Sequence, residues 1–303
     1  MLPMIVIAGP TGSGKSDLAM RVAEEFGGEV ASCDSVQVYR YFDIGSAKLP
    51  LAQRRGIPHH LIDLLEPGTV FTAGECSRTA RPILHEISGR GRVPVVVGGT
   101  GFYLRALLDG LAPAPGGDEA LRTRLLTREQ RRPGSLHRLL SRLDAIAAER
   151  MHPNNVQRTV RALELRLLGE TNEPSPADAL TGFQICKIGL RPPRAELYRR
   201  LDLRLEQMFE QGLIDEVRNL LSRGVPTTAK PFESLGYKQA LEFIQGVASF
   251  DEALAAAKLA TRHYAKRQLT WFRREPGMHW IEGFGSDASV QNEAIQWLAP
   301  RKI

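Results

Sequence analysis

The first third of the chain alternates short apolar runs with longer stretches in which apolar residues recur at helical spacing. Helices are predicted in the longer stretches, including Lys15–Phe26 and Thr72–Arg90. Strands that alternate with helices in this way are typical of an α/β fold, in which a parallel sheet is flanked by helices. The apolar runs that predict the buried strands are Pro3–Ala8, Glu29–Cys33, His60–Leu65 and Val93–Val97.

A stretch rich in proline and glycine, Leu111–Gly117, interrupts this alternation. Beyond it, Asp118–Glu170 contains no strand pattern, and a second polar break follows at Thr171–Gly182. Helical spacing recurs inside the segment, as in Leu136, Leu139, Leu140 and Leu143.

The strand pattern returns after the second break. Gln184–Leu190 predicts another buried strand, and long helices are predicted over Arg194–Gly212 and Asp251–Arg274. We therefore predict a P-loop-type α/β core, residues 1–115 and 182–303, with the C-terminal helices in its second part. A small all-helical domain, residues 116–181, is inserted between the two parts.

The 303 residues are 43% hydrophobic and 24% charged, a balance typical of a globular protein and not of a disordered one. Lysine and arginine number 40 against 34 acidic residues, which gives a formal charge of +6. The segment Asp118–Glu170 holds 11 arginines, no lysine and 7 acidic residues, so it carries +4 of that charge. This excess favours a polyanionic partner.

Cysteine usage and hydropathy exclude several classes of protein. Cys33, Cys76 and Cys186 lie far apart, which argues against a disulfide framework and against a cysteine zinc site. No apolar run approaches the about 20 residues that span a bilayer. The N-terminus lacks the charged region of a signal peptide. We expect a cytoplasmic protein with no membrane association.

The strongest chemical signal is a complete P-loop, G-x-x-x-x-G-K-[ST], between the first strand and the first helix. Its backbone N–H groups and the helix N-terminus attract phosphate oxygens. The lysine adds a point charge, and the final serine hydroxyl is placed to ligate Mg²⁺. A chance glycine-rich turn is the alternative, which the strand-to-helix context disfavours. The motif residues are Gly9, Pro10, Thr11, Gly12, Ser13, Gly14, Lys15 and Ser16.

Two strand ends carry further candidate chemistry. The strand Val93–Val97 ends in Gly98–Gly101, without the carboxylate that many P-loop NTPases carry there, so a motor or switch GTPase is disfavoured. Spacing alone leaves open whether this turn, with Thr100, lines a site. Asp34 follows the second strand, and carboxyl ends of parallel strands share one crevice. It is either a general base or outer-shell Mg²⁺ ligand, or a turn aspartate.

Basic residues gather at two places. Arg158 and Arg161 share a helix face beside Gln157, where they either grip nucleic-acid phosphates or form a solvated surface. The last long helix mixes basic and aromatic residues, which suits single-stranded nucleic acid or an amphipathic core face. From these residues alone, a small-molecule or nucleotide kinase with a basic helical insertion is the default interpretation. The residues of that helix are Arg262, His263, Tyr264, Lys266, Arg267, Trp271, Phe272, Arg273 and Arg274.

Taken together, the motifs resemble the tRNA dimethylallyltransferases, also called tRNA isopentenyltransferases. The D-S-x-Q-V-Y, H-P-N-x-x-Q-R-x-x-R and K-R-Q-x-T-W-F-R patterns are much more specific than the P-loop. At two positions the chain departs from the family pattern: Ser46 stands where threonine is commoner, and Phe102 stands where leucine is commoner. No Cys/His cluster follows, so we expect the bacterial type without a zinc finger. The matching blocks are the P-loop, Asp34–Arg40, Asp43–Lys48, Pro58–Asp63, Gly98–Tyr103, His152–Arg158, Arg161–Glu164, Gly236–Lys238 and Thr261–Arg273.

The resemblance implies a reaction. Such enzymes transfer a dimethylallyl group from dimethylallyl diphosphate to N6 of the adenosine at position 37 of tRNAs that read UNN codons. The products are N6-isopentenyladenosine and diphosphate. The alternatives are an adenylate isopentenyltransferase acting on free AMP, ADP or ATP, a P-loop kinase, and a non-enzymatic RNA-binding protein. The basic insertion argues against the first, because a free nucleotide needs no clamp.

The resemblance also implies roles for residues. Residues 9–16 hold the diphosphate, with Mg²⁺ as the cofactor bound through Ser16. Asp34 is the general base, Thr100 and Lys15 are also catalytic, and Arg218 is a weaker candidate for the diphosphate. The partner is the anticodon stem-loop of tRNA, bound by a monomer without an obligate protein partner. The implied tRNA-binding residues are Asp34, Ser35, Val36, Gln37, Thr100, Arg122, Gln157, Arg158, Thr159, Val160 and Arg161.

Overall fold

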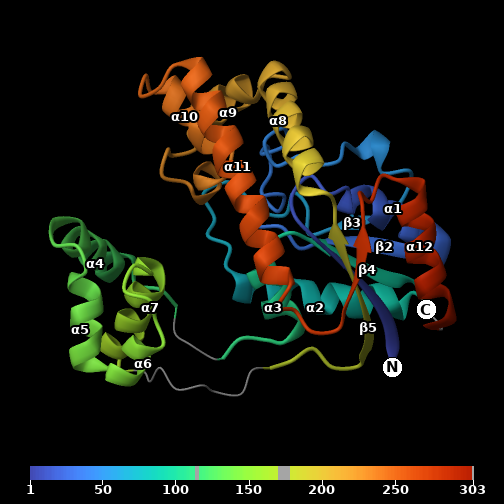
Figure 1. The fold of residues 1–303 in the computed structure, drawn as a ribbon, viewed down its shortest axis with the longest axis horizontal. Coiled ribbons are helices and arrows are strands. Elements are labelled where there is room, and N and C mark those ends of the chain that lie inside the picture. Colours follow the sequence, from blue (N-terminus) through green and yellow to red (C-terminus); the bar gives the residue numbers. More distant parts are fainter. Residues whose placement is uncertain (113–115, 170–177, 302–303) are drawn as a thin grey trace. The chain divides into compact units, whose positions relative to one another are not determined.

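A computed structural model describes residues 1–112, 116–169 and 178–301 (Figure 1). Contacts divide the chain into two units. The α/β unit comprises Met1–Gly110 and Ala179–Ile303, and the helical unit comprises Leu111–Asp178. Within the described residues, no helix is long and apolar enough to cross a membrane.

A six-stranded parallel sheet, in the order β3-β2-β4-β1-β5-β6, forms the centre of the α/β unit. Residues 4–8 of its central strand are all buried, as expected when helices cover both faces of a parallel sheet. The predicted α/β class is therefore confirmed. The strands are β1 (Leu2–Ala8), β2 (Gly28–Ser32), β3 (His59–His60), β4 (Val93–Gly98), β5 (Phe183–Arg191) and β6 (Met278–Glu282).

Alternate side chains of β1 serve two separate cores. Ile5 and Ile7 pack into a cluster with residues of α1 and α12, whereas Met4 and Val6 pack into one with residues of α2 and α3. The helices of this unit are α1 (Lys15–Phe26), α2 (Ala73–Gly89), α3 (Gly101–Leu108), α8 (Arg194–Glu210), α9 (Leu213–Ser222), α10 (Tyr237–Ile244), α11 (Phe250–Phe272) and α12 (Ala288–Leu298).

A third core joins α8, α9, α10 and α11 to the chain that follows β2. Tyr39 and Phe42 are almost fully buried in it, and Phe42 contacts the rings of Phe232 and Tyr237 edge-on. These helices pack against one another, α8 on α11 and α10 on both α9 and α11 (Figure 1). These four helices therefore cover the chain that follows β2 where it leaves the sheet.

Two strands differ from the prediction. The strand expected over His60–Leu65 is limited to β3, because Leu61 and Asp63 adopt positive φ angles of 64° and 56° that turn the chain out of the sheet. The edge strand β6 was not predicted. Its five residues gain their strand conformation from pairing with β5.

The helical unit has its own small core, in which Leu125, Leu140 and Leu163 are buried. Glu164 is fully buried beside this core. Its carboxylate accepts the Asp118 backbone N–H and pairs with the guanidinium groups of Arg122 and Arg161. The helices are α4 (Glu119–Arg131), α5 (Ser135–Leu143), α6 (Ala145–Glu149) and α7 (Val156–Leu167).

We predict that the helical unit loses stability in acid through Glu164. Burial raises the pKa of this carboxyl, but Arg161, the Asp118 N–H and Arg122 outweigh it, so the pKa lies below its ordinary value of 4.5. A lowered folded-state pKa gives stability that is present above 4.5 and is lost as the pH falls through the lowered value. Hydrogen exchange of α7 amides, compared with those of α1, measures this loss.

The matched variant is Glu164→Gln, which keeps the shape and removes the charge. It should destabilise the helical unit by about 3 kcal/mol at neutral pH and flatten its acid dependence. An unchanged acid profile in this variant would assign the pH dependence to other groups.

Candidate active site

Three loops meet at the carboxyl edge of the sheet. The P-loop follows β1, Asp34 follows β2, and Gly99 and Thr100 follow β4. Because β2, β4 and β1 are neighbours in parallel register, the three loops leave the sheet side by side. The Cys33 N–H donates to the Val97 carbonyl, which extends the β2–β4 pairing to the residue before Asp34.

The P-loop closes over the N-terminus of α1. Gly12 and Gly14 adopt φ angles of 76° and 79°, which side-chain-bearing residues rarely adopt. A Cβ at Gly14 would also lie 2.7 Å from the Ser286 nitrogen. The Lys15 ammonium donates to the Pro10 carbonyl at 2.7 Å across the loop.

Two cations face this loop. Burial and, to a smaller extent, the nearby charge of Arg204 lower the pKa of Lys15 to about 7, against the opposing charge of Asp34. Burial also lowers the pKa of Arg204, against the opposing charges of Asp34 and Asp17. Placing two like charges together in a half-buried site is unfavourable, and a bound polyanion relieves it.

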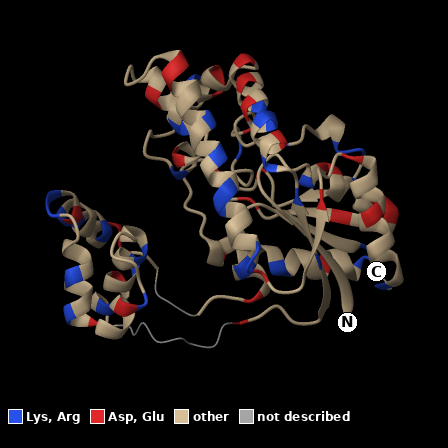
Figure 2. Cartoon of the chain, viewed as in Figure 1, with Lys and Arg blue, Asp and Glu red and all other residues tan. Residues whose placement is uncertain are grey.

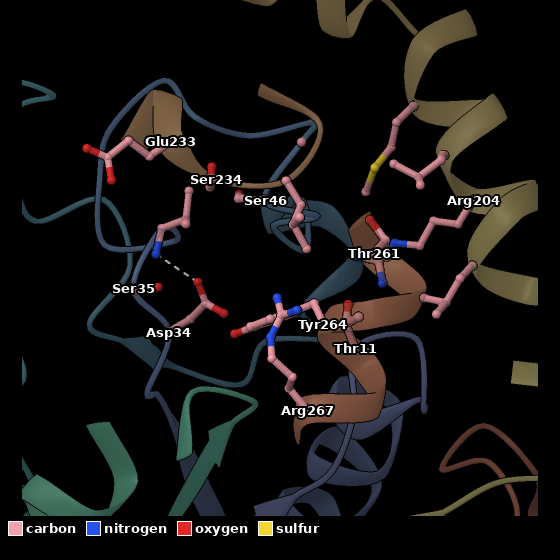
Figure 3. A pocket seen from close by; sticks show the side chains of 16 residues that line it. Thr11, Asp34, Ser35, Ser46, Arg204, Glu233, Ser234, Thr261, Tyr264 and Arg267 are labelled. Carbon is pink, nitrogen blue, oxygen red and sulfur yellow. Dashed lines mark hydrogen bonds between the residues drawn. The ribbon is translucent and has the colours of Figure 1, made fainter. Parts of the chain in front are cut away.

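Two adjoining cavities lie at this edge. A polar cavity of about 390 Å³ is lined by P-loop residues Gly12 to Ser16 except Ser13, with Arg200. A second cavity of about 330 Å³ adds apolar side chains, Val36, Leu201, Leu205 and Met208 (Figure 3). Their arrangement can hold a charged group in one cavity and an apolar group or flat ring in the other. The residues that line both cavities are Thr11, Asp34, Ser46, Arg204 and Tyr264.

The structure shows the turn that was one of the two interpretations of Asp34, and it also places Asp34 at the cavities. Its Oδ1 accepts the backbone N–H groups of Val36 and Gln37 at 2.8 and 3.2 Å, which is the geometry of an Asx turn. The same carboxylate lines both cavities. The turn therefore fixes the carboxylate where the two cavities join.

The donor set at the P-loop fits Mg²⁺. Ser16 and Asp34 line the same cavity and offer a hydroxyl and a carboxylate. The described part of the chain contains no group of three metal-ligating His, Cys, Asp or Glu side chains. Mg²⁺ is commonly held by one or two protein oxygens together with substrate phosphates and water, so few protein ligands are needed.

Gln37 lines the polar cavity, and the structure shows local partners for its side chain and for that of Arg218. Gln37 was expected to read an adenine edge, but its side-chain amide bonds to the Ser32 hydroxyl and the Ser46 carbonyl. Arg218 was expected to reach the diphosphate, but it lies on α9, pairs with Asp215 and lines neither cavity. Both the Gln37 amide and the Arg218 guanidinium therefore have local partners within the protein.

The predicted tRNA-binding residues of α7 differ in burial. Thr159 and Val160 were expected to contact tRNA, yet they are 1% and 4% exposed in the core of the helical unit. They occupy the inward face of a helix whose Gln157 and Arg158 are exposed. Arg161, together with Arg122 of α4, is held by Glu164.

Three residues that contact the site, Arg200, Arg204 and Gln268, were given no role from the sequence, and Tyr264 was named only as one aromatic residue of the last long helix. Arg200 and Arg204 are four apart on α8, a spacing that places both on one helix face and could have identified them. Tyr264 and Gln268 have the same spacing on α11. The spacing marks a shared helix face, but residues of α8 and α11 reach the P-loop only through tertiary packing, so spacing alone does not place that face at the site.

The loop Asp43–Lys48 borders the site, and interactions with Glu216 and Asp63 hold it in place. The Glu216 carboxylate accepts the N–H groups of Asp43 and Ile44 at 3.2 and 2.8 Å and the Tyr237 hydroxyl. Lys48, whose side chain is 4% exposed, pairs with Asp43 and Asp63. These bonds fix Ser46 against both cavities.

We predict that Glu216→Ala releases this loop. Loss of the acceptor leaves two N–H groups and a hydroxyl without their partner, at a cost of about 2 kcal/mol. Limited proteolysis should cut within residues 43–48 sooner, and thermal unfolding should shift downward. Asp215→Ala is the control, since Asp215 is an exposed neighbour on the same helix. Equal cleavage rates in the two variants would contradict the anchoring role.

Comparison with known proteins identifies the family. A family model described as IPP transferase matches residues 37–275, which is well over half of the chain. A model described as isopentenyl transferase matches residues 3–56. The chain belongs to the IPP transferase family. The family predicted from the sequence motifs is thereby confirmed.

Relatives of this IPP transferase extend over nearly the whole chain. The tRNA dimethylallyltransferase of Solibacter usitatus is 54% identical over 98% of both chains. That of Koribacter versatilis is 49% identical over 97% of both chains.

Solved structures agree with this assignment. The tRNA isopentenylpyrophosphate transferase of Bacillus halodurans matches with a TM-score of 0.75 and 36% identity, over 99% of this chain and 97% of that one. A eukaryotic dimethylallyltransferase described as acting on tRNA matches with a TM-score of 0.80 and 26% identity, over 100% of this chain and 80% of that one. The IPP transferase fold therefore includes both of the units described above.

Proposed function

We propose that the protein transfers a dimethylallyl group from dimethylallyl diphosphate to N6 of the adenosine at position 37 of tRNAs that read UNN codons. The observation that carries this proposal is the junction of the two cavities at Asp34. A polar cavity with Lys15 and Arg204 there adjoins an apolar one. The names of the relatives, which are tRNA dimethylallyltransferases, support the same reaction.

The P-loop cavity suits the diphosphate of the donor. Backbone N–H groups of the loop, Lys15 and Arg204 surround the position of the phosphate oxygens. Ser16 would hold Mg²⁺, which supplies positive charge to the leaving diphosphate. Together these groups stabilise the charge that develops on the leaving group as the C–O bond breaks.

Asp34 suits the role of general base. The exocyclic amine of adenine is a weak nucleophile because its lone pair is delocalised into the ring. As the N6–C bond forms, the amine must lose a proton, which the Asp34 carboxylate accepts. The electron pair of the breaking C–O bond leaves with the diphosphate. Because the Asx turn fixes the carboxylate, little reorganisation is needed for this step.

The acceptor adenosine must leave the stacked anticodon loop to reach Asp34. Ser35 and Val36 line the apolar cavity and suit contacts with the flipped base. Exposed Gln157 and Arg158 on α7 suit contacts with the anticodon stem-loop. Figure 2 shows basic residues on several helices of this unit, which matches a phosphate-binding surface. We further propose that the protein acts as a monomer in the cytoplasm, where its free cysteines stay reduced.

A transfer assay tests the function directly. Purified protein with Mg²⁺ receives labelled dimethylallyl diphosphate and either unmodified tRNA that reads UNN codons or free AMP. Label should enter the tRNA and should be abolished by replacing adenosine 37. Label in AMP alone would make the protein an adenylate isopentenyltransferase. Phosphate transfer from ATP without prenyl transfer would make it a kinase.

We predict that Asp34→Ala lowers kcat by about 100-fold or more, because the general base is lost. The tRNA dissociation constant should change little. Asp34→Asn is the matched control for shape, because its side-chain oxygen still accepts the turn N–H groups while it takes up no proton. Normal turnover in Asp34→Asn would exclude the general-base role.

We predict that Arg158→Ala weakens tRNA binding about 3- to 10-fold at low salt and makes the salt dependence shallower, because one phosphate contact is lost. The KM for dimethylallyl diphosphate should stay the same. Arg142→Ala, an exposed arginine on α5 of the same unit, is the control. A defect of equal size at all salt concentrations would argue against a phosphate contact.

A further inference from the structure

The side chain of Gln268 joins two of the loops at the site. Gln268 lies on α11 and is 6% exposed. Its Oε1 accepts the Thr11 backbone N–H at 2.8 Å, and its Nε2 donates to the Gly99 carbonyl at 2.8 Å. One amide therefore connects the loop after β1 to the turn after β4, although neither loop is near α11 in the sequence.

Both ends of the amide are needed for these contacts. The acceptor is required by an N–H of the P-loop and the donor by a carbonyl of the Gly98–Gly101 turn. The Tyr264 hydroxyl adds to this network. Burial and the charge of Asp34 raise the pKa of Tyr264, and hydrogen bonds with the Thr100 and Gln268 side chains oppose this rise. The network therefore reaches from the P-loop to Thr100.

Gln268 also occupies the space beside Lys15. A Cβ built on Gly99 would lie 2.5 Å from the Gln268 Nε2 and 3.5 Å from the Lys15 Nζ. A side chain at position 99 would have to displace this amide. Many P-loop proteins carry a carboxylate near this strand end, and the present chain has none in Gly98–Gly101.

We propose that Gln268 is a positioning residue that holds the P-loop in the shape that binds the diphosphate of the donor, by bridging Thr11 to Gly99 with an uncharged group. A carboxylate at this place would pair with Lys15 and cancel one of the two cations that face the diphosphate. It would also lack the N–H that bonds to the Gly99 carbonyl. An amide holds the same two loops and leaves the charge of Lys15 and Arg204 for the ligand.

The electrostatics of the site agree with this role. The pKa of Lys15 is lowered to about 7 by burial and Arg204, with Asp34 as the opposing acid. A second acid beside Lys15 would stabilise the lysine ammonium before the ligand binds. The binding of a diphosphate would then release less free energy. This inference rests on the proposed function for the identity of the diphosphate donor.

The test compares Gln268→Glu, Gln268→Met and the wild type. Titration calorimetry with inorganic diphosphate and Mg²⁺ measures the dissociation constant in the absence of tRNA. We expect Gln268→Glu to weaken this binding about 10-fold or more and Gln268→Met to weaken it by a smaller factor. The KM for dimethylallyl diphosphate should rise in the same order, while the tRNA dissociation constant stays within about twofold of the wild type.

The control variant is Gln239→Glu. Gln239 is a buried amide on α10 whose Oε1 accepts the Gly236 N–H, a bond that glutamate can still accept. It should bind diphosphate like the wild type. This variant separates the effect of adding a carboxylate anywhere in the unit from the effect of adding one beside Lys15.

Three results would overturn the inference. Wild-type diphosphate affinity in Gln268→Met would show that the bridge does not position the P-loop. Equal losses of diphosphate affinity in both Gln268 variants would show that the charge of the residue at position 268 does not matter. Parallel losses of tRNA binding and thermal stability would show a general structural role. If Gln268→Glu fails to fold, Gln268→Met alone decides the bridging role.

The diphosphate titration also separates this inference from the proposed function. A wild-type protein that binds diphosphate but transfers no prenyl group to tRNA would contradict the proposed function, and the comparison of the Gln268 variants would still be valid.

Discussion

The parallel pairing of β2, β4 and β1 is the constraint on which the site depends. It brings the ends of three strands to one edge, so that Asp34 and Gly99, distant in the sequence, line one cavity with the P-loop. Apolar side chains on both faces of β1 pack into two separate cores, which hold this strand in the centre of the sheet. The position of the site therefore depends on buried apolar residues that do not themselves line it.

A second layer of structure completes the site from the other side. The helices α8 and α11 pack on each other and bring Arg204 and Gln268 over the P-loop. Arg204 adds a second cation to that of Lys15, and Gln268 fixes the loop backbone. Charge and position are therefore supplied by separate residues. In the proposed reaction, this division leaves both cations available to the diphosphate, with no carboxylate in Gly98–Gly101 at the end of β4.

The helical unit is stabilised in a different way from the α/β unit. Its small core is supported by a buried carboxylate, Glu164, that holds Arg122 and Arg161. Arginines in this unit consequently have two functions, since some neutralise the buried acid and others, such as Arg158, remain at the surface. Net charge alone does not distinguish the two groups. Their difference depends on which face of each helix is buried.

The sequence by itself determined the α/β class, the P-loop and the family, because these are encoded in local periodicity and in contiguous motifs. It also placed Asp34 at the sheet edge, because strand ends follow from apolar runs. It did not reveal the site positions of Arg204 and Gln268 or the strand β6, and it did not show the local partners of Gln37 or the burial of Thr159 and Val160. Their roles depend on which partner each meets after folding. A hydrogen bond between Thr11 and Gln268 joins residues 257 positions apart, and only the tertiary structure decides such a contact.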